Sequence, residues 1–186
     1  GKLAYSTVDG KNYGVPFDNG AVIGAYRTDI LEQAGYTTAD LTDIDWNRFI
    51  EIGKDVKAKT GTYMLSGQAD SPDTIMMMLQ SAGASLFDED GKPAMTDNAA
   101  LKECIDIYKT MVDEGIYLEV NKWDDYVTSI TKGSVAGVIN GNWIIATIQG
   151  MEDTAGKWEI TNMPKLIKTP NATNYSNNGG SSWYIT

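Results

Sequence analysis

The fold of this chain follows from one stretch, Val135-Ala-Gly-Val-Ile-Asn-Gly-Asn-Trp143. Its first six residues form a short apolar run typical of a buried strand, and an apolar helical pattern continues from there to Gln149. A strand that turns through glycine into a helix is typical of layered α/β domains. In open α/β sheets, ligands bind at the carboxyl ends of the strands, which is where Gly141-Asn-Trp143 is expected to lie.

Strands and helices alternate on both sides of this stretch, without an internal repeat. We predict a buried strand over 21–26 and a strand over 158–163 that Pro164 ends. Pro16 indicates that the extended segment 13–17 is an edge strand or a crossing strand, and Asp9-Gly10 indicates a hairpin turn. Helical spacing and capping residues predict helices over 28–35, 45–61, 71–83, 97–115 and 124–132.

The helix signals also predict caps and a core. The predicted N-caps are Thr28 or Asp29, Asp45, Ser71 and Asp97. We expect Trp46 to pack in the core. The helix over 97–115 is expected to bury a stripe formed by Leu101, Cys104, Ile105, Tyr108, Met111 and Val112. Cys104 is the single cysteine, and its apolar surroundings predict a buried thiol rather than a nucleophile.

Composition argues against several classes of function. The 186 residues carry 25 acidic and 15 basic side chains, for a formal net charge of −10, which argues against binding to nucleic acid or to an anionic membrane surface. Histidine is absent, so histidine-based catalysis and the commonest zinc sites are excluded. No apolar stretch is long enough to span a membrane. The first residues lack a signal peptide, and we expect the chain to be a piece of a longer protein.

A second informative stretch is Asn177-Asn-Gly-Gly-Ser-Ser-Trp183, near the C-terminus. Paired glycines weaken a strand, so they mark either a tight turn or a close backbone contact. Both this stretch and the first one place a tryptophan beside amide or hydroxyl groups, and a flat ring beside polar groups suits a sugar. Two alternatives stay open here: Trp143 packs in the core, and Asp18-Asn19-Gly20 is a simple turn rather than a hinge.

Six motifs, taken in order, resemble extracellular solute-binding proteins of sugar ABC transporters, the maltose-binding-protein-like family. They are Tyr13-Gly-Val-Pro-Phe-Asp-Asn-Gly, Ala25-Tyr-Arg-Thr-Asp-Ile-Leu-Glu-Gln-Ala-Gly35, Asp45-Trp-Asn-Arg-Phe49, Gly133-Ser-Val-Ala-Gly-Val-Ile-Asn-Gly-Asn-Trp143, Lys157-Trp-Glu-Ile160 with Met163-Pro164, and Gly179-Gly-Ser-Ser-Trp183. Each motif is weak alone, but together they cover nearly the whole chain in the family's order. One departure is Gly137, where methionine is commoner in the family.

The resemblance implies one lobe of a type II periplasmic-binding-protein fold, an α/β fold with a mixed sheet flanked by helices. Residues 1–186 would form a single-domain fragment, mainly the second lobe of a two-lobe protein, with hinge crossings near 15–20 and 180–183. The ligand would lie in the cleft between the lobes, with Trp143 stacked under a sugar ring. The other ligand-binding residues that the resemblance implies are Asp18, Asn19, Gly180, Ser181 and Trp183. Gln68 and Trp123 are weaker candidates, in loops that can reach the cleft.

By the same resemblance, the function is extracellular binding of a sugar or oligosaccharide for uptake by an ABC transporter, whose permease is the protein partner. The implied protein is a monomeric periplasmic protein or cell-surface lipoprotein, with no enzymatic activity, cofactor or metal. The alternatives are a lectin-like surface module and a glycoside-active enzyme. An enzyme of that kind needs two carboxylates facing each other across a cleft, and no motif here pairs two carboxylates.

Overall fold

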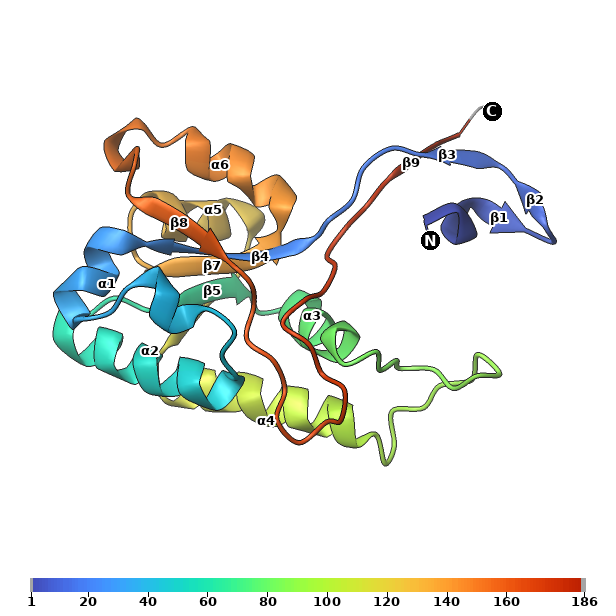
Figure 1. Cartoon of the computed structure of the whole chain (residues 1–186), viewed down its shortest axis with the longest axis horizontal. Coiled ribbons are helices and arrows are strands. Elements are labelled where there is room, and N and C mark those ends of the chain that lie inside the picture. The colour runs from blue at the N-terminus through green and yellow to red at the C-terminus, as the bar shows by residue number, and fades with distance from the viewer. Residues whose placement is uncertain (1, 185–186) are drawn as a thin grey trace.

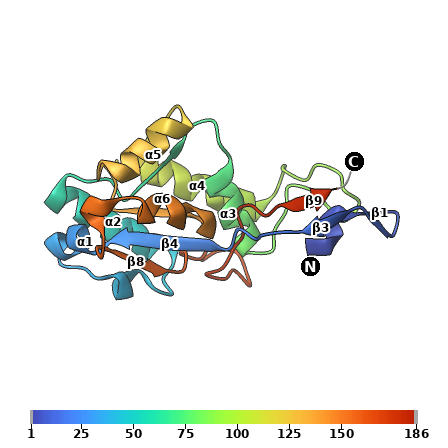
Figure 2. The same cartoon turned by 90° about the horizontal axis from the view of Figure 1, so that it is seen from above.

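The computed structural model describes residues 2–184. The sequence also predicts a strand at the C-terminal end of the chain, and its last two residues, Ile185 and Thr186, lie outside the described residues, as does Gly1. The chain forms a layered lobe and a thin arm that leaves the lobe at one side (Figures 1 and 2). Both ends of the chain lie on the arm (Figure 1). Over the described residues, no helix has the length and apolar character that crossing a membrane requires.

A three-stranded antiparallel sheet forms the centre of the lobe, with β4 (Val22–Arg27) between β7 (Gly137–Gly141) and β8 (Trp158–Thr161). Side chains alternate across the sheet: Ala25 packs on one face and Tyr26 on the other, and both are fully buried. The strands predicted over 21–26, 135–140 and 158–163 are therefore confirmed, with shifts of up to two residues at their ends.

Two further strands, which the sequence analysis missed, extend this sheet. β5 (Leu65–Gln68) runs parallel to β6 (Tyr117–Val120). The backbone N–H groups of Ala136 and Gly137 donate to the carbonyl oxygens of Tyr63 and Met64, at 2.7 and 2.9 Å, and so join β5 to the β7 side of the sheet. The combined sheet is mixed, as the sequence analysis predicted.

Gly137, the departure from the family motif, lies opposite Tyr26 across β7 and β4. A Cβ atom at Gly137 would lie 2.2 Å from Cδ1 of the Tyr26 ring. The tyrosine ring therefore fills the space that a side chain at position 137 needs. Glycine at this position follows from the tyrosine on the neighbouring strand.

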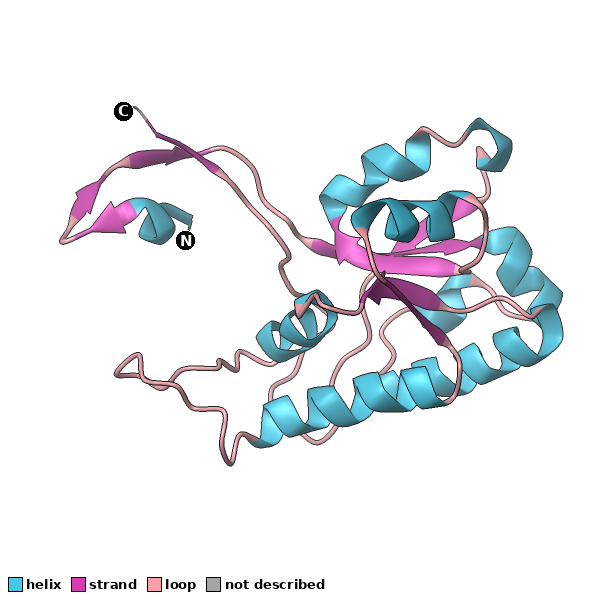
Figure 3. Cartoon of the chain, turned by 180° about the vertical axis from the view of Figure 1, so that it is seen from behind, coloured by secondary structure: helices cyan, strands magenta, loops and turns pink. Residues whose placement is uncertain are grey.

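Helices cover both faces of the sheet, α5 and α6 on one side and α2 and α4 on the other (Figures 1 and 3). The helices are α1 (Thr28–Ala34), α2 (Trp46–Thr60), α3 (Asp73–Ser81), α4 (Ala99–Asp113), α5 (Trp123–Thr131) and α6 (Ile145–Gln149). Short 3-10 turns are η1 (Lys2–Ser6), η2 (Thr38–Leu41), η3 (Asn142–Ile144) and η4 (Glu152–Thr154). All the predicted helices are present.

The predicted caps are partly wrong. Asp45 caps α2 as expected, since its carboxylate accepts from the Arg48 N–H at 2.9 Å. Asp97 does not cap α4, because its backbone is in the left-handed region at φ 61°. The cap is the next residue, Asn98, whose side chain accepts from the Leu101 N–H at 3.0 Å.

Two other caps also differ. α1 begins at Thr28 itself, with Arg27 at the cap position, and Asp29 lies in the first turn, where its carboxylate is paired with the Arg27 guanidinium. α3 begins at Asp73, and the Ser71 hydroxyl accepts from the N–H of Asp73 at 3.3 Å, just ahead of the helix. Both helices start within two residues of the predicted position.

The buried side of α4 also differs from the predicted stripe. Cys104 and Met111 are fully buried as expected, and burial raises the pKa of the Cys104 thiol to about 12. Ile105 is 46% exposed, whereas Ile107 is buried in its place. Trp46, at the start of α2, lies in the core as predicted.

Glu103, also on α4, is a buried carboxylate. It accepts hydrogen bonds from the backbone N–H groups of Ile167 and Lys168 and from the Thr169 hydroxyl, each at 2.8 Å. Burial alone would raise the pKa of Glu103, but these hydrogen bonds outweigh it and lower the pKa. The carboxylate holds the 167–169 loop against α4.

The arm consists of η1, a hairpin of β1 (Thr7–Val8) and β2 (Lys11–Asn12), and a pair formed by β3 (Gly14–Pro16) and β9 (Ser182–Tyr184). The Asp9-Gly10 turn joins β1 to β2, as predicted. Pro16 lies on a strand whose one partner is β9, which confirms its position at a sheet edge.

Candidate functional site

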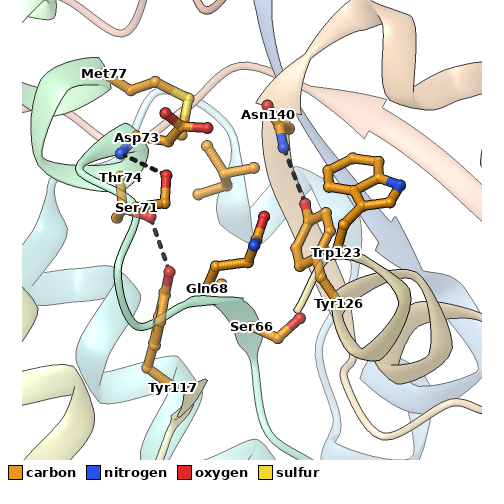
Figure 4. Close-up of a pocket in the computed structure, with 12 residues that line it drawn as sticks. Ser66, Gln68, Ser71, Asp73, Thr74, Met77, Tyr117, Trp123, Tyr126 and Asn140 are labelled. Atoms are coloured by element: carbon orange, nitrogen blue, oxygen red, sulfur yellow. Dashed lines mark hydrogen bonds between the residues drawn. The ribbon is translucent and has the colours of Figure 1, made fainter. Parts of the chain in front are cut away.

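A polar pocket opens at the carboxyl ends of β5, β6 and β7, beside the first turns of α3 and α5 (Figure 4). It is a shallow hollow of about 30 Å³ that is open to solvent. Its walls are formed by Ser66, Gly67, Gln68, Ser71, Asp73, Thr74, Met77, Tyr117, Trp123, Tyr126, Ile139 and Asn140. The position agrees with the expectation that ligands bind at the carboxyl ends of the strands.

Hydrogen bonds hold the pocket side chains in place. The hydroxyls of Thr74 and Tyr117 bond at 2.9 Å, and the Asn140 amide donates to the Tyr126 hydroxyl at 3.0 Å (Figure 4). Burial raises the pKa of Tyr117 to about 12, so its hydroxyl stays neutral at physiological pH. Gln68 ends β5 and points into the hollow (Figure 4). The walls therefore offer neutral donors and acceptors in fixed positions.

Two tryptophans lie at the edge of this pocket. Trp123 begins α5 and lines the hollow, and its ring centroid lies 5.9 Å from that of Trp143 in η3. Trp123 is 45% exposed and Trp143 is 39% exposed. Trp143 is therefore not a core residue. The glycine turn that opened the sequence analysis places its ring at the surface, next to the pocket wall.

A close backbone contact fixes this tryptophan pair to the C-terminal segment. The Trp143 indole Nε1–H donates to the Asn178 carbonyl oxygen at 2.9 Å. A Cβ atom at Gly20 or Gly141 would lie 2.0 or 2.3 Å from that same oxygen. The two glycines are thus needed where the 14–22 segment, the 176–184 segment and the β7–η3 turn meet.

The predicted hinge crossings lie side by side as one antiparallel ribbon. The Phe17 N–H donates to the Ser181 carbonyl oxygen at 2.9 Å, and the Asn178 N–H donates to the Gly20 carbonyl oxygen at 2.7 Å. The Asp18 carboxylate accepts from the Ser181 N–H, which brings these two predicted site residues together. The two crossings therefore contact each other at several points along the ribbon.

The remaining predicted site residues lie on the same ribbon. Asn19 is exposed, and its side-chain oxygen accepts from the Ala21 N–H at 3.4 Å. Gly180 has a φ of 115°. Trp183 lies on the arm, 67% exposed, with its ring edge-on to Phe17 at 5.5 Å. None of these three residues lines the pocket described above.

Sequence reasoning missed much of the pocket wall. Ser66 and Tyr117 were not predicted, because the short strands β5 and β6 were not recognised. Asp73, Thr74 and Tyr126 lie on helices that were predicted, but no local pattern showed that these side chains face a shared pocket. The two candidates with the weaker support, Gln68 and Trp123, do line the hollow. Within residues 2–184, no group of three or more histidine, cysteine, aspartate or glutamate side chains is arranged to hold a metal ion.

Comparison with known proteins gives a consistent result. A family model described as bacterial extracellular solute-binding protein matches residues 1–186. The lactose-binding protein of Rhizobium radiobacter is 45% identical over 184 residues, which are 99% of this chain and 43% of that protein. The chain therefore spans less than half the length of this relative.

Solved structures show the same fold. An ABC-transporter-associated binding protein from B. animalis subsp. lactis, in complex with beta-1,6-galactobiose, superposes with a TM-score of 0.78 at 25% identity, over 96% of this chain and 44% of that one. The GacH receptor of Streptomyces glaucescens superposes with a TM-score of 0.79 at 22% identity, over 98% of this chain and 46% of that one. The periplasmic-binding-protein fold predicted from the motifs is thereby confirmed.

Proposed function

The chain belongs to the bacterial extracellular solute-binding proteins, and from this premise we propose that it forms one wall of a sugar site in an ABC-transporter binding protein. The observation that carries the proposal is the pair of exposed rings, Trp123 and Trp143, beside a pocket lined by amides, hydroxyls and the carboxylate of Asp73. Rings cover the apolar C–H face of a sugar, while fixed amides and hydroxyls pair with its hydroxyl groups.

We propose a short oligosaccharide that contains galactose as the ligand class. The relative at 45% identity is named for lactose, and the binding protein at 25% identity holds beta-1,6-galactobiose. Both sugars carry a galactose unit. Two exposed rings beside fixed hydrogen-bond donors and acceptors suit a sugar better than an ion.

Each group in the site has a proposed role. Trp123 and Trp143 stack on the sugar, and Gln68 and Asp73 pair with its hydroxyls. Of the residues expected from the family, Asp18 and Ser181 are bonded to each other, which supports a role in joining the crossings. Asn19, Gly180 and Trp183 stay predictions, as contacts made when a second lobe closes over the pocket.

Transport and location also belong to the proposal. The family is described as extracellular, which supports a periplasmic or surface location. We further propose that the protein is monomeric, carries a lipid anchor and has the transporter permease as its partner. The relatives are binding proteins, and the pocket wall in the described part of the chain holds one carboxylate, Asp73. Glycoside hydrolysis needs two carboxylates, so this lobe by itself offers no acid–base pair.

The experiment that tests the proposal is titration calorimetry with lactose, beta-1,6-galactobiose and maltose, on the polypeptide from the complete reading frame around this chain. We expect one galactose-containing sugar to bind. Trp123→Ala and Trp143→Ala are each expected to raise its Kd roughly tenfold or more, a loss of about 1.4 kcal/mol. Trp123→Ala should have the larger effect, because that ring lines the hollow.

Trp158→Phe is the matched control. Trp158 lies on β8, and its indole donates to Thr154 on the far side of the lobe from the pocket. Its replacement should leave the Kd unchanged. Failure of all three sugars to bind would reject the ligand class. Sugar binding that survives both pocket variants would reject the placement of the site.

A further inference from the structure

Asn178, just before the C-terminal crossing, contacts several groups around the pocket. The Asn178 side-chain amide donates to Asn140 Oδ1 at 2.8 Å and to Asp73 Oδ2 at 3.4 Å, and both acceptors belong to pocket residues. Its backbone carbonyl oxygen accepts the Trp143 indole N–H at 2.9 Å. Asn178 therefore joins the tryptophan pair, the end of β7 and the start of α3.

Asn140 carries this contact into the lobe. It is buried, with 6% exposure, and its amide nitrogen donates to the Tyr126 hydroxyl at 3.0 Å. Its oxygen accepts from the Gly141 N–H at 2.8 Å in addition to the Asn178 amide. Because the side chain is held at both ends, a shift of Asn178 breaks hydrogen bonds inside the pocket wall.

The backbone changes character directly after Asn178. Gly179 and Gly180 have φ angles of 112° and 115°, a region that side-chain-bearing residues rarely adopt. Beyond them, the Ser181 N–H and carbonyl are bonded to the N-terminal crossing at Asp18 and Phe17. Asn178 on the lobe side and Ser181 on the arm side are both held by hydrogen bonds, and the two glycines lie between them.

We infer that Asn178 is a positioning residue, which couples the pocket to the angle between lobe and arm across the Gly179–Gly180 pivot. Its amide holds the lobe end of the pivot against Asn140 and Asp73, and its carbonyl holds the Trp143 ring. A sugar that shifts Trp143 or Asn140 therefore changes the preferred angle between arm and lobe. By linkage, a change in that angle alters the affinity for the sugar by the same coupling factor. The coupling to sugar rests on the proposed function, whereas the mechanical link does not.

The link is tested by NMR on the 186-residue chain with isotope-labelled tryptophan indoles and no sugar. The reporters are Trp143 at the pivot, Trp183 on the arm, and Trp46 and Trp158 in the body of the lobe. Asn178→Ala keeps the backbone carbonyl that accepts the Trp143 indole N–H but removes the side-chain hydrogen bonds to Asn140 and Asp73 that hold it in place. We therefore expect hydrogen exchange of the Trp143 indole to rise roughly fivefold. The Trp183 indole should also become more mobile relative to Trp46, while Trp46 and Trp158 keep their wild-type signals.

Two further variants keep the result decisive. Asn178→Asp preserves the shape but places a carboxylate beside Asn140 Oδ1 and Asp73, so it should loosen the pivot at least as much as Asn178→Ala. Asn162→Ala is the matched control, because Asn162 also makes two hydrogen bonds, both to Asp43, away from the pocket. It should leave Trp143 and Trp183 unchanged.

Wild-type exchange and mobility at Trp143 and Trp183 in both Asn178 variants would overturn the inference, as would a change spread equally over all four reporters. Lactose is then added to the polypeptide from the complete reading frame. The wild-type protein should shift the Trp183 signal on binding, and Asn178→Ala should lose that shift while still binding. If lactose does not bind at all, the proposed function fails, and the sugar-free result still decides the mechanical link.

Discussion

The lobe and the arm use the same kinds of apolar side chain with opposite results. In the lobe, Trp46 and Phe49 are at most 1% exposed and pack edge-on at 5.3 Å. On the arm, Phe17 and Trp183 also pack edge-on, at 5.5 Å, but they are 66% and 67% exposed. Both regions therefore contain an aromatic contact, but only the lobe buries its rings.

The difference lies in the number of layers. The lobe has helices on both faces of its sheet, so each apolar face is covered (Figures 1 and 2). The described part of the arm is a thin ribbon that carries the short η1 turn, whose Ser6 hydroxyl donates to Ser182 on β9, and it leaves Phe17 and Trp183 exposed. Apolar surface stabilises a fold in proportion to the area removed from water. We therefore expect the stability of this chain to be concentrated in the lobe.

The largest expected effect tests that statement directly. Phe49→Ala removes a fully buried ring from the centre of the core and should lower the free energy of unfolding by about 3–5 kcal/mol. Urea denaturation, followed by circular dichroism, measures this loss. A cost near that of an exposed substitution would show that the lobe core is not the main source of stability.

The second prediction concerns the buried carboxylate of the lobe. Glu103→Gln replaces charge-assisted hydrogen bonds to the 167–169 loop and should cost about 1–3 kcal/mol at neutral pH. Because folding lowers the pKa of Glu103, its contribution is present above its unfolded pKa and is lost as the pH falls through the folded value.

Denaturation of wild type and Glu103→Gln between neutral and strongly acidic pH checks the sign. The gap in unfolding free energy should be widest at neutral pH and should shrink below about pH 4. A gap that stays constant with pH would show that the cost comes from packing and not from the charge. Glu119→Gln, on a glutamate whose carboxylate accepts from the Tyr108 hydroxyl outside the buried core, serves as the comparison.

The smallest expected effect comes from the arm. Trp183→Ala removes a ring that is larger than that of Phe49, yet it should change the unfolding free energy by about 0.5 kcal/mol or less, because the ring is exposed. The same denaturation measurement applies. A loss of unfolding free energy comparable with that of Phe49→Ala would contradict the contrast between the two regions. If Trp183→Ala costs more in a longer polypeptide than in this chain, further residues of that polypeptide cover the arm.

Regular elements with strong local signals were predicted well. The Asp45 cap, the glycines after the helices and the apolar strand before Gly141 act through neighbours in the sequence, so a linear reading detects them. β5 and β6 were missed because they are four residues long and carry serine, glycine, glutamine and glutamate. Their strand conformation depends on pairing with each other across a separation that local patterns do not contain.

The same limit explains the candidate site. Trp143 was selected from its turn, and Gln68 and Trp123 from their loops, because these signals are local. Asn178 lies in the 177–183 stretch but was not selected as a site residue, since its importance comes from partners at positions 20, 73, 140 and 143.

The sequence by itself determined the α/β class, the order of the helices, the edge position of Pro16 and the family, because each of these is written in short-range pattern or in the order of motifs. Only the tertiary structure decided which polar side chains meet at the carboxyl ends of β5, β6 and β7, and that the two crossings contact each other. The Thr74–Tyr117 bond in the pocket joins residues 43 positions apart, and the Asp18–Ser181 bond joins residues 163 positions apart. Such contacts exist only once packing has brought the segments together.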